Sequence, residues 1–152
     1  MLFRSHLDHG IRVAVGTDVG VGPRFSLWQE LAEVYKVQQV QGVGLDGARL
    51  LYLGTLGGAR ALNLDHETGN FAMGKSADFW ILDPADSPYL SSRLGTCESK
   101  EEQLFALLHL ATETDVRATY VAGRRIQSLT DGLAEVIGRC WMAFRLWIEG
   151  EA

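Results

Sequence analysis

A short apolar run that ends on a carboxylate, Val13–Asp18, constrains the fold more than any other part of the chain, and it leads directly into the glycine-containing turn Val19–Gly22. Read with the two-residue period of a β-strand, its residues divide between two faces. One face carries Val13, Val15 and Thr17, and the other carries Ala14, Gly16 and Asp18. A face of small residues that ends in Asp is typical of the crowded inside of a parallel barrel, where functional side chains project from the carboxyl ends of the strands. The segment therefore predicts a barrel strand with Asp18 as its candidate site residue. The alternative is that Asp18 only begins a turn, because Asp and Gly are ordinary turn residues.

Length and composition limit what this strand can belong to. The chain has 152 residues, 47% of them hydrophobic, which is enough for one core. A complete eight-stranded α/β barrel takes about 250 residues, so the sequence predicts a piece of a barrel and an incomplete protein.

Charge, cysteine spacing and hydropathy indicate the compartment and exclude two classes of partner. The formal charge of −5 and the lack of a basic cluster argue against a nucleic-acid partner. The two cysteines, Cys97 and Cys140, lie far apart without metal-type spacing, which fits a reducing compartment. No run approaches the ~18 uninterrupted apolar residues of a membrane span, and the first nine residues carry charges where a signal peptide needs an apolar core. We expect a cytoplasmic protein without a nucleic-acid or membrane partner.

Up to about residue 66 the pattern after the strand is helical. Ser26 with Gln29 forms a capping-box signature, and apolar residues then recur at helical spacing to about Gln39. Residues 42–46 interrupt this pattern, and Asp46 is placed to cap a second apolar helix that reaches Leu62. The pair Gly57-Gly58 is where we expect that helix to split in two.

The second part of the chain, residues 67–128, predicts strands with an inserted helix. Turn residues at 69–75 lead to the unbroken apolar run Phe79–Leu82, which predicts a strand covered on both faces. An amphipathic helix is expected over 101–112, with acidic residues in its first turn. Residues 118–121 and 124–126 flank Ala122-Gly123 in the pattern of a tight hairpin. A helical tail, 129–152, completes the chain, with a helix over about 133–148.

Four spaced motifs carry a family resemblance. They are Gly10–Asp18 (GIRVAVGTD), Thr55–Leu62 (TLGGARAL), Gly69–Phe79 (GNFAMGKSADF) and Tyr120–Arg124 (YVAGR). In this order they resemble the carboxyl-terminal third of an amidohydrolase-superfamily deaminase. The sequences around Asp18 and around Tyr35 are similar to those of the guanine deaminases within that superfamily. The resemblance covers roughly residues 10–126, and the tail from Gln127 onward does not match it.

The resemblance implies an α/β fold: the terminal segment of a distorted (β/α)8 amidohydrolase barrel, part of the small β-sandwich built from both ends of the family chain, and here a C-terminal helix. It implies a zinc ion held by a His-x-His, two further histidines and an Asp that ends the eighth strand. Asp18 stands at the position of that Asp. The resemblance also gives this carboxylate a catalytic role, taking a proton from the attacking water and passing it toward the leaving ammonia, with guanine as the substrate. Zinc would supply an activated water near neutral pH.

The remaining zinc ligands implied by the family have no counterpart in this sequence. The four histidines are His6, His9, His66 and His109, and none forms a His-x-His. His6 and His9 precede the strand, on the side away from the site. His66 lies in a polar loop, and His109 lies among leucines, as expected of a partly buried helix residue. Catalytic zinc takes three protein ligands, so we expect this chain to hold no complete site and to be inactive alone.

Two consequences concern partners and solubility. The active protein would need an upstream complementing chain or a homo-oligomer, and the substrate-binding residues cannot be assigned because the family places them upstream. Unpaired strand edges also predict poor solubility or self-association of the isolated chain.

Other interpretations stay open at this point. The chain can be a non-catalytic interaction or dimerisation module, with Trp28, Trp141 and Trp147 on an apolar surface that the tail helix covers or uses to dimerise. It can also be part of another aminohydrolase that acts on a triazine, adenine-like or cytosine-like ring. Arg24, in the loop after Asp18, is a residue that reaches substrate or, more simply, a solvated surface cation. A nucleotide-phosphate loop is excluded, because Phe25 stands where the glycine signature needs its third glycine.

Overall fold

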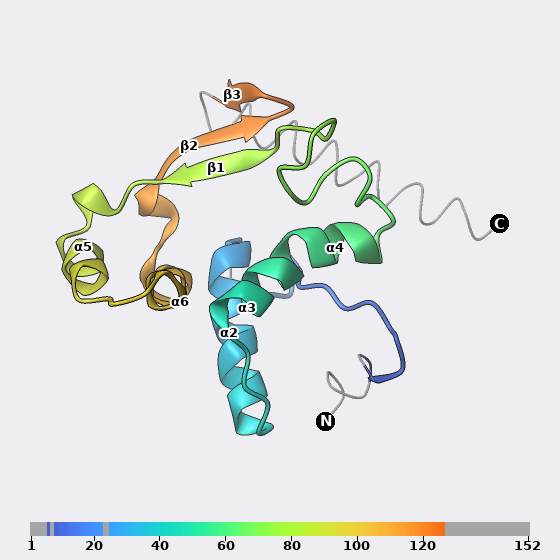
Figure 1. Cartoon of the computed structure of the whole chain (residues 1–152), viewed down its shortest axis with the longest axis horizontal. Coiled ribbons are helices and arrows are strands. Elements are labelled where there is room, and N and C mark those ends of the chain that lie inside the picture. Colours follow the sequence, from blue (N-terminus) through green and yellow to red (C-terminus); the bar gives the residue numbers. More distant parts are fainter. Residues whose placement is uncertain (1–5, 7, 23–24, 127–152) are drawn as a thin grey trace.

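The structure is a computed structural model, and it describes residues 6, 8–22 and 25–126. Figure 1 shows a helical layer below a small sheet, with the chain entering through an extended segment that runs past the helices. The elements, in chain order, are α2 (Leu27–Val40), α3 (Gly47–Gly54), α4 (Leu56–Ala61), β1 (Phe79–Leu82), η1 (Pro84–Asp86), α5 (Pro88–Gly95), α6 (Lys100–Leu110), η2 (Glu113–Asp115), β2 (Val116–Val121) and β3 (Arg124–Ile126).

The helix starts follow local capping chemistry. The Ser26 hydroxyl accepts a hydrogen bond from the Gln29 amide at the start of α2, and the Asp46 carboxylate accepts one from the Arg49 amide at 2.7 Å at the start of α3. The predicted caps are therefore confirmed. The Gln29 side chain does not complete a capping box, because its amide donates to Glu113 Oε2 at 3.3 Å.

The core lies between α2, α3 and α6. Leucines from these helices and from the loop before α3 form one cluster of buried side chains: Leu31, Leu45, Leu50, Leu53 and Leu108. Val15, from the extended N-terminal segment, packs against this cluster, and its amide approaches the Leu53 carbonyl oxygen at 3.4 Å. None of the described helices is long and apolar enough to cross a bilayer.

The sheet has the order β1-β2-β3 and is antiparallel throughout. Phe79 pairs with Tyr120 and Ile81 with Ala118, before the register shifts between Ile81 and Leu82. Ala122 and Gly123 join β2 to β3 with φ angles of 49° and 76°. Positive φ at both central residues is the geometry of a type I′ turn, so the predicted hairpin is confirmed.

The predicted barrel strand at Val13–Asp18 is not part of a sheet. Residues 11–18 have no ladder partners in the described chain, and a strand is held by neighbouring strands rather than by its own hydrogen bonds. The expected two faces are nevertheless present: Val13, Val15 and Thr17 are half-buried, whereas Ala14, Gly16 and Asp18 are exposed.

Three further expectations need correction. The helix after Asp46 breaks at Thr55, where φ is −129° and ψ is −102°, and Gly57-Gly58 lie inside α4. The run Phe79–Leu82 is a strand but is not covered on both faces, because Trp80 and Ile81 are 41% and 42% exposed. Helix α5 was not expected, since Pro88–Gly95 lacks a clear apolar period; its first-turn proline supplies the start instead. The predicted helix over 133–148 lies outside the described residues.

Candidate functional site

Asp18 lies at the end of the extended segment, in a tight loop. Its φ is 47°, and its carbonyl oxygen accepts hydrogen bonds from the amides of Val21 (3.0 Å) and Gly22 (2.6 Å). A side chain at Gly22 would lie 2.1 Å from the Thr17 carbonyl oxygen, so this close approach requires glycine. The loop reverses the chain directly after Asp18, as the carboxyl end of a strand followed by a turn requires.

The Asp18 side chain is exposed, and among the described residues its carboxylate has no hydrogen-bond or ion-pair partner. A carboxylate with both oxygens open is a suitable ligand for a divalent cation or a suitable proton acceptor. Arg24, the candidate substrate contact beside it, lies outside the described residues.

The histidines are not gathered around Asp18. The ring of His66 is exposed and lies 3.2 Å from the Glu67 carboxylate. His109 is half-buried in α6, where its Nδ1 lies 2.8 Å from the Phe105 carbonyl oxygen and its ring packs edge-on against Tyr35. Both positions agree with the sequence expectation. His6 and His9 lie at the beginning of the described chain, before the extended segment.

The described residues do not provide a complete set of zinc ligands. Within residues 6, 8–22 and 25–126, no group of three or more His, Cys, Asp and Glu side chains is close enough to hold a metal ion. Catalytic zinc takes three protein ligands. The described part of the chain therefore does not fit a zinc site by itself.

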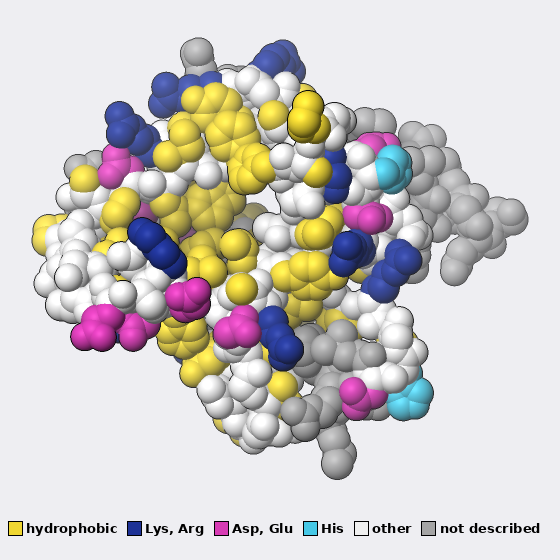
Figure 2. All heavy atoms as spheres, in the orientation of Figure 1, with side chains coloured by type: hydrophobic (Ala, Val, Ile, Leu, Met, Phe, Trp, Pro, Cys, Tyr) yellow, Lys and Arg dark blue, Asp and Glu magenta, His cyan; other side chains and the backbone are white. Residues whose placement is uncertain are grey.

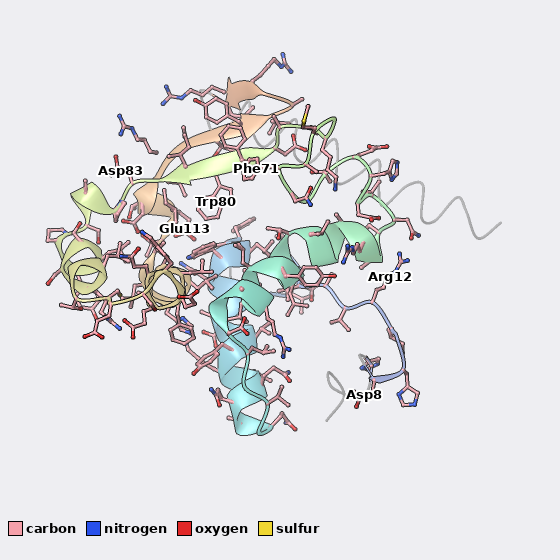
Figure 3. All side chains as sticks on the ribbon, in the orientation of Figure 1. Asp8, Arg12, Phe71, Trp80, Asp83 and Glu113 are labelled. Atoms are coloured by element: carbon pink, nitrogen blue, oxygen red, sulfur yellow. The ribbon has the colours of Figure 1, made fainter. Side chains whose placement is uncertain are left out.

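Arg12 fixes the extended segment against the helices, which sequence reasoning missed. Its Nη1 donates to the Arg60 carbonyl oxygen and to Asn63 Oδ1, both at 2.6 Å, at the end of α4 (Figure 3). Arg60 in turn donates to the Tyr52 hydroxyl at 3.2 Å, and this contact raises the pKa of Arg60 above its ordinary value. Arg12 and Asn63 are some 50 residues apart in sequence, so no local sequence pattern predicts this contact.

A pocket of about 230 Å³ lies between the sheet and the helices. Its most prominent walls are the indoles of Trp28 and Trp80, which meet edge to face with ring centroids 4.8 Å apart. Figure 3 shows Trp80 and Glu113 together between β1 and α2, and Figure 2 shows apolar side chains lining the hollow there. Leu31, Leu51 and Thr119 also line the pocket, and Asp18 does not.

The pocket and the Asp18 loop are therefore two separate features. Trp28 is held in place by a hydrogen bond from its Nε1 to the Leu107 carbonyl oxygen at 2.7 Å, which ties α2 to α6. This contact agrees with a packing role for Trp28, which is the usual role of a tryptophan side chain. The pocket itself could not be found from the sequence, because its walls come from five separate elements.

Comparison with known sequences gives a consistent family. Guanine deaminase of Escherichia coli strain K12 is 40% identical over 116 residues, which is 76% of this chain and 26% of that protein. A probable guanine deaminase of Deinococcus radiodurans is 45% identical over 123 residues, 79% of this chain and 28% of that protein. The chain thus spans little more than a quarter of the length of these relatives.

Solved structures agree with the sequence relatives. The structure of E. coli guanine deaminase superimposes with a TM-score of 0.79 at 37% identity, over 83% of this chain and 30% of that one. An adenosine deaminase from Xanthomonas campestris, with bound zinc, gives a TM-score of 0.66 at 23% identity over 90% of this chain and 31% of that one, which shows a shared fold alone. The sequence model that describes the amidohydrolase family matches residues 1–126, which include the Asp18 loop, the helical layer and the sheet. The chain therefore belongs to the amidohydrolase family.

Proposed function

We propose that this chain is part of a zinc-dependent guanine deaminase, the hydrolase that converts guanine to xanthine and ammonia. The observation that carries the proposal is the likeness of more than three quarters of this chain to guanine deaminases in sequence and in fold. The substrate is carried over from those relatives.

Asp18 is the residue that we propose for the chemistry. In the assembled enzyme its carboxylate would be one of the residues that hold zinc, and it would accept a proton from the attacking water and pass it to the leaving amino group. Its open carboxylate, at the end of a segment fixed by Arg12 and Val15, supports this role. Zinc, when bound, supplies an activated water near neutral pH.

The proposal includes a dependence on further residues. Among the described residues no group of three or more ligating side chains is close enough to hold a metal ion, and catalytic zinc takes three protein ligands. The ligands other than Asp18 therefore come from an upstream complementing chain. We expect the chain alone to be inactive.

The test is complementation. The chain is assayed for release of xanthine and ammonia from guanine, alone and after co-expression with the upstream region of a guanine deaminase, with zinc supplied. We expect activity only in the mixture. Activity of the chain alone would overturn the claim that its active site is incomplete. A mixture that folds together yet deaminates adenine or cytosine in place of guanine would overturn the assignment of guanine as the substrate.

The role of Asp18 is tested in the same mixture. Asp18→Ala removes both the ligand and the proton acceptor, so we expect a rate loss of at least ~10²-fold, the lower end for a general base. Asp8→Ala is the matched control, since it removes another exposed carboxylate from the same N-terminal part (Figure 3). Equal rates for the two variants would remove the proposed role.

A second candidate is a non-catalytic interaction module. Exposed apolar side chains favour it, among them Phe71, Trp80 and Ile81, which are 83%, 41% and 42% exposed. Zinc content and size in solution separate the two: a zinc-free, stable dimer that does not assemble with the upstream region supports the module.

A further inference from the structure

The outer face of the sheet, defined here as Phe79, Ile81, Ala118 and Tyr120, is an apolar surface turned away from the helices. Side chains alternate along a strand, and Trp80 and Thr119 line the pocket on the helix side. Their neighbours in sequence therefore point the other way. The register places Phe79 opposite Tyr120 and Ile81 opposite Ala118, so the four residues form one continuous surface.

This outer face is ordered within itself and only partly covered, because Ile81 is exposed whereas Phe79, Ala118 and Tyr120 are half-buried. The rings of Phe79 and Tyr120 stack with centroids 4.5 Å apart, and Phe71, from the loop before β1, packs edge-on against Phe79. Ile81 is 42% exposed. Figure 2 shows apolar side chains gathered over β1 and β2. A sheet with an uncovered apolar face needs a covering element.

The tail of this chain has the position and the composition for that element. Residues 127–152 continue directly from β3, the edge strand of the same sheet, and they lie beyond residue 126, where the family match ends. At helical spacing six of their apolar residues share one side, while Met142 and Leu146 fall on the other. The six are Leu133, Val136, Ile137, Cys140, Phe144 and Trp147. The opposite side carries Glu135, Arg139 and Arg145.

Dimensions agree with this pairing. A helix over 133–148 would be about 24 Å long, and a six-residue strand such as β2 is about 20 Å long, so one such helix spans the face. The helix side of the sheet offers no such room, because Trp28 already packs on Trp80 and the pocket there is only about 230 Å³.

We propose that the tail, residues 129–152, covers the outer face of its own sheet through the stripe that contains Cys140. The tail would then replace, within one polypeptide, a cover that otherwise has to come from a second molecule.

Disulfide trapping in the full chain tests this directly. Cys97 is changed to Ser, which leaves Cys140 as the only thiol, and a second cysteine is introduced by Ala118→Cys on the outer face. Thr119→Cys is the matched control, since it is the next residue on β2 and faces the helices. The proteins are oxidised in dilute solution with oxidised glutathione and analysed by non-reducing electrophoresis and mass spectrometry.

We expect an intramolecular disulfide between residues 118 and 140 that forms at least tenfold faster than the one between 119 and 140. Moving the thiol to the polar side of the predicted helix, by Cys140→Ser with Arg139→Cys, should abolish the difference. Ile81→Cys, opposite Ala118 in the register, repeats the test if Ala118→Cys fails to fold by circular dichroism.

Three results would overturn the proposal. Equal rates for the 118 and 119 variants mean that the tail does not distinguish the faces. A disulfide found only between two molecules means that a second copy covers the face. Absence of any disulfide from both outer-face positions means that another element occupies it.

Discussion

The helical layer and the sheet of this chain differ in how far each completes its own packing. Leu31, Leu50 and Leu108, from three different helices, are 2%, 0% and 1% exposed. In the sheet, Trp80 and Ile81 remain about two-fifths exposed. A helix satisfies its backbone internally and needs one covered face, whereas a strand needs neighbours along its edges and layers on its faces. The helical layer is therefore nearly self-sufficient, and the sheet is not.

The N-terminal segment that carries Asp18 belongs with the sheet in this comparison. It is extended, its inner face contacts the core through Val15, and its outer face of Ala14, Gly16 and Asp18 is open. It is held by Arg12 rather than by a ladder of strand hydrogen bonds. The parts proposed for chemistry and for assembly are thus those that the described chain leaves incomplete.

The largest expected effect is in the helical core. Leu50 is fully buried at the centre of the leucine cluster, so Leu50→Ala should lower the free energy of unfolding by about 2–5 kcal/mol. Leu62→Ala, at a leucine that is 62% exposed just after α4, should change it by less than about 0.5 kcal/mol. Urea unfolding followed by circular dichroism measures both. Similar losses in the two variants would mean that the helical layer is not the stable region.

Two neighbouring glycines in α4 sharpen the test of close packing. A methyl group at Gly57 would lie 2.7 Å from the Tyr52 carbonyl oxygen and 2.9 Å from its ring, so Gly57→Ala should cost about 1–3 kcal/mol.

At Gly58 the nearest atom would be 3.6 Å away, and Gly58→Ala should stabilise the chain by up to about 1 kcal/mol through helix propensity. Thermal unfolding compares the pair, and the same sign for both substitutions would contradict the packing described here.

The sequence predicts a structural feature well when the residues that cause it lie close together in the chain. Ser26 and Asp46 cap their helices within three residues, and Ala122-Gly123 sets its own turn, so all three were predicted correctly. The helix break was placed at Gly57-Gly58 because glycines weaken helices, but the tight contact with Tyr52 makes Gly57 a packing residue inside α4.

The same distinction applies to the site. Asp18 stood out because it ends an alternating segment, and its role stays a prediction. Arg12 and the pocket between Trp28 and Trp80 depend on residues about 50 positions apart, which periodicity does not detect. The barrel strand was expected from its own alternation, yet a strand also requires a partner that sequence pattern does not supply.

A smaller effect measures how firmly the two regions are joined. The edge-to-face contact between Trp28 of α2 and Trp80 of β1 links them across the pocket, and aromatic pairs of this kind contribute about 0.5–1.5 kcal/mol. A double-mutant cycle of Trp28→Ala and Trp80→Ala should return a coupling energy in that range from urea unfolding. The cycle cancels the separate loss of the Trp28 hydrogen bond to Leu107. Zero coupling would mean that the sheet and the helices are stable independently.

The smallest expected effect is at the hairpin, within the less complete region. Ala122 has a φ of 49°, which strains a residue with a Cβ, and Asn is better tolerated there. Its amide donates to Asp78 Oδ1 at 2.7 Å, a bond that substitution at Ala122 leaves in place. We expect Ala122→Asn to raise the free energy of unfolding by about 0.5 kcal/mol, whereas Gly123→Ala, at a φ of 76° with no neighbouring atom closer than 3.9 Å, should lower it by about 1 kcal/mol through backbone strain alone. Both substitutions should move the thermal midpoint if the hairpin unfolds together with the helical layer. If neither moves it while Leu50→Ala does, the hairpin unfolds before the helical layer. The sheet would then gain its stability only when its open face and edges are covered.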